Sequence, residues 1–204
     1  MDHYVKKQYG VIRKSSLYNA CLLLFLTISL NSTWNMISVL WWGSVGLLIL
    51  SFFLSKGNGS IVLYDYTKWM LLFTILCILS IFVALDKKIA IDRIKNLFVI
   101  LVSFTVVRNQ INSNSEILNT LKFLYVAIGI NAVYLLSKMD LSLIGSVQIG
   151  NGTNEGWNGN AIGIMMAMGV LIGIYLIECG TSKLWTKILI IIATILYIYI
   201  SLFT

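Results

Sequence analysis

Proline is missing altogether from the 204 residues, and charged residues are scarce. Average usage would give roughly ten prolines, so no helix of this chain is kinked at a proline. Charged residues make up 11% of the chain, against roughly 25% in a soluble domain. A chain of this size therefore lacks the charge to coat a globule in water, which excludes a soluble enzyme, a disordered chain and a nucleic-acid-binding module.

Reactive side chains are scarce as well. His3 is the one histidine, and the three cysteines (Cys21, Cys77 and Cys179) are isolated within or at the end of apolar runs. Zinc sites need several His or Cys ligands at close spacing, so we expect no metal. The odd cysteine count implies no complete disulfide framework. No dinucleotide-binding glycine motif, P-loop lysine or nucleophile-elbow serine is present, and we expect no cofactor.

Apolar sequence is what the chain has in abundance, with 58% hydrophobic residues and a mean hydropathy of +0.87. A helix that crosses a bilayer needs about 20 mostly apolar residues. The sequence therefore predicts an all-α, polytopic membrane helix bundle, with residues 1–204 forming a single transmembrane domain. Seven spans are expected, the first and fourth of them short: Ser16–Leu30, Trp34–Leu54, Trp69–Leu85, Ile94–Val107, Leu118–Leu136, Ala161–Glu178 and Leu184–Phe203.

Lysine and arginine are unevenly shared between alternate loops. Ten of them fall on the side of the N-terminus and five on the other side. By the positive-inside rule this places the N-terminus in the cytoplasm. The segments Asn31–Asn35, Asp86–Lys95 and Lys138–Asn160 then face outward.

The outward segment Asp86–Lys95 (DKKIAIDRIK) carries four cations on the side that should be poor in them. In one interpretation its lysines snorkel to lipid headgroups, and Asp92 offsets Arg93 and Lys95. In the other, the cations are held outside to meet an anionic ligand. Both interpretations stay open at this point.

A second outward segment, Gly145–Gly163, is dense in asparagine and glycine around one tryptophan. The amides of Asn154, Asn158 and Asn160 could donate to and accept from sugar hydroxyls, and the Trp157 ring could stack on a sugar ring. The alternative is a flexible turn in which Trp157 is an interfacial anchor and Asn160 caps the next helix.

The order of these elements carries a resemblance. Several apolar spans are followed by a polar outer loop and then by a span that opens with Trp157-Asn158-Gly159-Asn160-Ala161-Ile162-Gly163. This order resembles the N-terminal portion of the O-antigen polymerase and ligase superfamily. The resemblance covers all 204 residues by hydropathy and 151–163 by motif. It implies a longer protein of ten or more spans, whose outer loop with the proposed catalytic Arg and His residues would follow Thr204. The uncharged end of the last apolar run fits that expectation.

The resemblance also implies a reaction. A hydroxyl of one lipid-linked glycan attacks the anomeric carbon of another, and polyprenyl pyrophosphate leaves. Arg93 with Lys95 would then face the phosphates, and Asn154, Trp157, Asn158 and Asn160 the glycan. The catalytic base is not visible in these residues. The implied partners are the lipid-linked oligosaccharide, membrane lipids and other polysaccharide-assembly membrane proteins, and the implied activity is that of a glycosyltransferase.

Two other functions stay open on the sequence alone. A compact, basic helical protein of this length also suits the substrate-binding membrane subunit of a small-molecule importer. A lipid-linked-sugar flippase is the third possibility. Further spans and an outer loop with Arg and His after Thr204 would favour the polymerase, whereas a stop codon there would favour the importer subunit.

Overall fold

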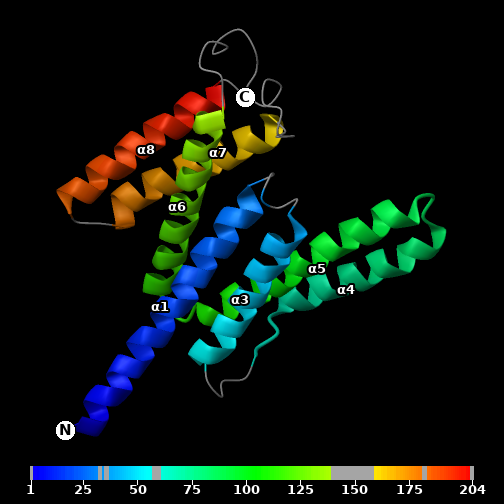
Figure 1. Cartoon of the computed structure of the whole chain (residues 1–204), viewed down its shortest axis with the longest axis horizontal. Helices are drawn as coiled ribbons and strands as arrows, with labels where there is room; N and C mark the ends of the chain where they lie inside the picture. Colours follow the sequence, from blue (N-terminus) through cyan, green and yellow to red (C-terminus); the bar gives the residue numbers. More distant parts are fainter. Residues whose placement is uncertain are drawn as a thin grey trace. The chain divides into compact units, whose positions relative to one another are not determined.

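The computed structural model describes residues 2–31, 34, 37–56, 61–138, 159–180 and 183–202, of which 2–15, 56 and 180 by their backbone alone. Helices account for nearly all of them, and no strand occurs in these ranges, which confirms the predicted all-α class. The helices are α1 (Asp2–Leu30), α3 (Ser38–Lys56), α4 (Asp65–Ser80), the 3-10 turn η1 (Ile81–Val83), α5 (Lys87–Gln110), α6 (Asn114–Lys138), α7 (Gly159–Tyr175), the π turn η3 (Leu176–Gly180) and α8 (Leu184–Leu202) (Figure 1).

The helices support a membrane protein, but with fewer clear spans than the seven expected. Five stretches are long and apolar enough to cross a bilayer: Ser38–Ser55, Asp65–Val83, Asn114–Lys138, Gly159–Cys179 and Leu184–Leu202. The apolar run Ser16–Leu30 is too short by this measure. Helix α5 also falls short, because its charged first turns leave too few apolar residues before Arg108.

The chain divides into two compact units. Unit 1 comprises Met1–Tyr18 and Val45–Ser113, and unit 2 comprises Asn19–Ser44 and Asn114–Thr204. In unit 1, α4 and α5 pack against each other as a helical hairpin joined through η1, which Figure 1 shows as two adjacent green helices. The short connection makes the two helices antiparallel.

Unit 2 is built on α6, α7 and α8. Its buried centre includes Ile128, Leu135, Met166, Tyr197 and Ile200. Small residues at the helix contacts let the backbones approach closely, as is usual between membrane helices. A Cβ atom added at Gly169 of α7 would lie 2.6 Å from Cδ2 of Tyr197 on α8. The Tyr197 ring therefore lies directly against the α7 backbone.

Within unit 2, α1 and α6 run side by side in the same direction. The Asn131 amide on α6 donates to the Thr27 carbonyl oxygen on α1 at 3.1 Å. Further along both segments, the rings of Trp34 and Tyr134 lie 4.9 Å apart. Because the contacts advance together along the two segments, the helices are parallel (Figure 1).

Candidate functional site

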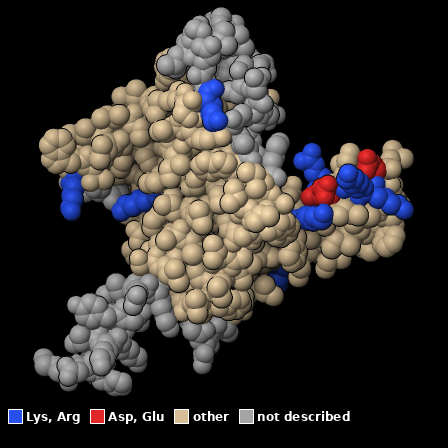
Figure 2. Space-filling model, in the orientation of Figure 1, with Lys and Arg blue, Asp and Glu red and all other residues tan. Residues whose placement is uncertain are grey.

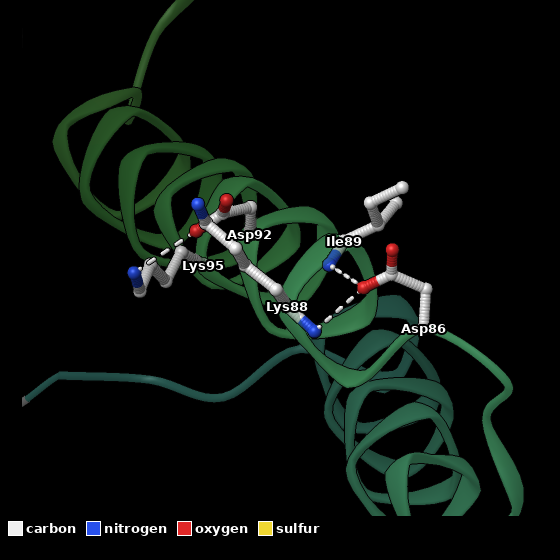
Figure 3. Close-up of polar contacts among 5 residues, drawn as sticks. All are labelled: Asp86, Lys88, Ile89, Asp92 and Lys95. Atoms are coloured by element: carbon white, nitrogen blue, oxygen red, sulfur yellow. Dashed lines mark hydrogen bonds and ion pairs between the residues drawn. The ribbon is translucent and has the colours of Figure 1, made fainter.

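The predicted cationic segment Asp86–Lys95 forms the start of α5 in unit 1. Asp86 precedes the helix in an extended conformation, and its Oδ1 accepts from the backbone N–H groups of Lys88 and Ile89, both at 3.0 Å (Figure 3). This is an N-cap, which contributes about 1 kcal/mol to helix stability. Since the carboxylate of Asp86 occupies these donors, an external anion here would be bound by side chains.

Charged side chains of both signs cover this part of the hairpin, and Figure 2 shows them interspersed there. The Lys95 ammonium pairs with Asp92 at 3.0 Å, and these side chains are 55% and 60% exposed. Lys88, Asp92 and Lys95 follow one another at intervals of four and three residues, so they share one stripe of the helix (Figure 3).

Arg93 lies off that stripe. It is exposed, and its guanidinium makes no hydrogen bond or ion pair with the rest of the described chain. Residues two apart on a helix do not face each other, so Arg93 and Lys95 point to different sides of α5. The structure therefore separates the two predicted phosphate-binding cations: Lys95 is engaged by Asp92, whereas the Arg93 guanidinium is available.

The connection before Asp86 exposes apolar side chains next to these charges. Phe82, Val83 and Leu85 are exposed almost completely. A membrane interface has a hydrocarbon layer and a headgroup layer. The apolar side chains at the hairpin end suit the hydrocarbon, and the cations in the following turns suit the headgroups. This end of unit 1 is suited to contact an amphiphile with an anionic headgroup.

The second predicted element belongs to unit 2. Asn154, Trp157 and Asn158 lie outside the described residues. Asn160 is exposed in the first turn of α7, which begins at Gly159. Asn160 is therefore one position inside the helix and not at the capping position before it, because the helical backbone begins earlier than the apolar run.

Sequence reasoning missed a buried polar cluster in unit 2. The Tyr125 hydroxyl donates to the Ile190 carbonyl oxygen at 2.8 Å and lies 3.0 Å from Thr194 Oγ1. The Tyr197 hydroxyl donates to the Tyr125 carbonyl oxygen at 3.0 Å. These bonds join α6 to α8 and satisfy polar groups inside an apolar bundle. Tyrosine and threonine at helical spacing within predicted spans were the available signal.

No group of three or more potential metal ligands occurs within the described ranges. Comparison with models of known protein families, with curated proteins and with solved structures finds no match for this chain.

Proposed function

We propose that this chain belongs to a membrane enzyme that transfers a polyprenyl-pyrophosphate-linked glycan to a glycan or lipid acceptor on the outer face of the bacterial cytoplasmic membrane. Such a reaction serves capsule, exopolysaccharide or O-antigen assembly. The observation that carries the proposal is the exposed guanidinium of Arg93, which has no partner among the described residues, in the turns that follow an apolar hairpin end. The resemblance of 151–163 to the polymerase and ligase superfamily supplies the reaction class.

The chemistry needs a cation where Arg93 lies. When the anomeric carbon is attacked, negative charge develops on the departing pyrophosphate, and a positioned cation stabilises that charge in the transition state. A guanidinium suits this role because its planar donors bind two phosphate oxygens at once. Lys95 contributes less, since Asp92 already neutralises it.

The proposal includes a topology with seven crossings and a cytoplasmic N-terminus. If α1 and α6 both cross the bilayer, their parallel direction requires an odd number of crossings between them. That number is three when α3, α4 and α5 all cross, and one when the α4–α5 hairpin stays on the side of the N-terminus. Three crossings place Asp86–Lys95 on the outer face, where lipid-linked glycans are polymerised.

Alanine substitution at Arg93 tests the phosphate role against snorkelling. Removing a charge-assisted contact costs roughly 1.5–3 kcal/mol, and each 1.36 kcal/mol is about tenfold in rate. Arg93→Ala should therefore lower polymer yield about ten- to a hundredfold at unchanged protein level. Lys87→Ala is the matched control, because Lys87 is an exposed cation at the start of the same helix.

The assay is the polymer ladder made by a strain that carries each variant in place of the wild-type gene, normalised to protein in the membrane. Arg93→Lys should retain part of the activity, since it keeps the charge and loses the planar donors. Wild-type ladders from Arg93→Ala would contradict the proposal and leave the snorkelling interpretation.

A further inference from the structure

An apolar cavity of about 230 Å³ lies within unit 1, on the half of the hairpin away from Arg93. Its walls come from α3, the segment 61–64, α4 and α5, and include Phe52, Leu63, Leu71 and Val106. A dry apolar cavity of about 150 Å³ already admits benzene. This cavity is therefore large enough for part of a hydrocarbon chain.

One polar side chain lines the cavity without a partner. Thr67, in the first turn of α4, is 3% exposed, and its hydroxyl makes no hydrogen bond within the described chain. By contrast, Thr74 and Thr105 donate to the carbonyl oxygens four residues earlier, each at 2.8 Å. Buried hydroxyls are nearly always hydrogen-bonded, so Thr67 has a donor to offer to a molecule in the cavity.

A cation, Arg108, follows the cavity-lining residue Val106 two positions later in α5. The Arg108 guanidinium stacks over the Tyr64 ring at 4.2 Å, and its Nη1 donates to the Ile111 carbonyl oxygen at 2.9 Å. None of the carboxylates in the described ranges forms an ion pair with Arg108. Its remaining N–H donors are available to an anion, while the stacked Tyr64 ring restricts where the side chain can go.

We propose that the cavity binds one acyl chain of an ester-linked anionic glycerophospholipid. The chain fills the apolar space, the ester carbonyl oxygen accepts from the Thr67 hydroxyl, and the phosphate faces Arg108. Such a lipid offers a hydrocarbon chain to the apolar wall, an ester carbonyl oxygen to the hydroxyl and a phosphate to the guanidinium, so each of the three features of the site has a counterpart. A polyprenyl phosphate has no carboxylic ester carbonyl oxygen for Thr67, so this site is separate from the proposed glycan transfer and does not depend on it.

The ester bond makes the proposal testable. The purified full chain in detergent is titrated with two phosphatidylglycerols that share chains and headgroup, one ester-linked and one ether-linked, and native mass spectrometry gives each Kd. The wild type should bind the ester lipid roughly two- to tenfold more tightly, as expected for one hydrogen bond. Thr67→Val should abolish that preference.

Thr74→Val is the matched control, because it removes a threonine hydroxyl from the same helix that is already bonded to Met70. It should keep the ester preference. Val106→Trp should weaken both lipids by filling the cavity, and Arg108→Gln should weaken both without changing their ratio.

Equal binding of ester and ether lipids by the wild type would overturn the proposal without reference to any variant. A preserved ester preference in Thr67→Val would also overturn it. Undecaprenyl phosphate that displaces the ester lipid at equal concentration would overturn the assignment to a glycerophospholipid. Thr67→Val should fold as the wild type does in lipid-free detergent, because it removes a hydroxyl that has no partner there.

Discussion

At the scale of single residues, the closest helix contacts of unit 2 depend on the absence of side chains. Tyr197 of α8 lies against Gly169 of α7 and Gly129 of α6, and a Cβ at Gly129 would come within 2.7 Å of the Tyr197 hydroxyl oxygen. The same hydroxyl donates to the Tyr125 carbonyl oxygen. One tyrosine therefore joins three helices through a ring contact and a hydrogen bond.

Gly169→Ala should lower the free energy of unfolding by about 1–3 kcal/mol, because overpacking a filled contact forces backbone or side-chain shifts. The added Cβ would also lie 3.1 Å from Cγ2 of Ile128, so a shift away from Tyr197 would not give it free space. Thermal unfolding in detergent, followed by tryptophan fluorescence, measures the change. Gly46→Ala in α3 is the control, since nothing lies within 4 Å of its added Cβ, and its stability should stay the same or rise slightly.

The candidate cations show what residue-level reasoning could reach. Four cations within one short segment were visible in the sequence, and so was the possibility that Asp92 offsets some of them. The helical period then decides which one is paired: Asp92 lies three residues before Lys95 and forms the 3.0 Å ion pair, whereas Arg93 follows it directly and faces elsewhere. That distinction required knowing that the helix begins before these residues.

At the scale of elements, the non-helical segment 61–64 is held by one side chain, which bonds to both backbone groups of Val62 as a neighbouring strand would. The Asn109 amide donates to the Val62 carbonyl oxygen at 2.9 Å, and its oxygen accepts from the Val62 N–H at 2.8 Å. Asn109 also donates to the Thr105 carbonyl oxygen at 3.0 Å. Backbone groups that a helix would satisfy internally are satisfied here by one amide of α5.

Asn109→Ala should speed amide hydrogen exchange at Val62 roughly tenfold, because a lost hydrogen bond of about 1–1.5 kcal/mol raises the population of the open segment accordingly. Mass spectrometry of peptides that cover 61–64 measures the rate. Asn112→Ala is the control, because the exposed Asn112 side chain donates to the carbonyl oxygen of Gln110, two residues before it, and this bond does not involve segment 61–64. Unchanged exchange at Val62 in Asn109→Ala would show that another contact holds the segment.

Element ends were harder to predict than element existence. The expected span Leu184–Phe203 and the observed α8 (Leu184–Leu202) nearly coincide, because apolar length alone defines that helix. Helix α5 begins at Lys87 and not at Ile94, since Asp86 caps it and a helix does not end where its apolar face ends. Hydropathy also could not indicate that Asn131 bonds to Thr27, because a polar residue in an apolar run has no partner until the helices are placed.

At the scale of the whole molecule, the parallel direction of α1 and α6 restricts how the chain can thread the membrane. If α1 and α6 both cross the bilayer, the α4–α5 hairpin crosses with both of its helices or with neither. Helix α4 together with η1 is apolar enough to cross, whereas α5 is not. Helices in a membrane are stabilised by packing against one another. Because α4 packs against α5, it can help the less apolar α5 to cross.

Labelling of single cysteines in a background without Cys21, Cys77 and Cys179 decides between these topologies. If the chain crosses seven times from a cytoplasmic N-terminus, residues 87 and 146 lie outside. In intact cells an impermeant thiol reagent should then modify Ser146→Cys and Lys87→Cys and spare Lys56→Cys. Protection of Lys87→Cys alone would mean that the hairpin does not cross. Labelling of Lys56→Cys with protection of Ser146→Cys would reverse the whole orientation.

The pairing of α1 with α6 also has a consequence for biosynthesis. The residues joined by the Asn131–Thr27 hydrogen bond are 104 positions apart in the chain. At about 5–20 residues per second, a ribosome needs roughly 5–20 s to make the intervening sequence. The first helix is therefore made many seconds before the partner to which Thr27 bonds. The contact between α1 and α6 in unit 2 consequently cannot form until translation has passed Asn131, so α1 spends that interval without this partner.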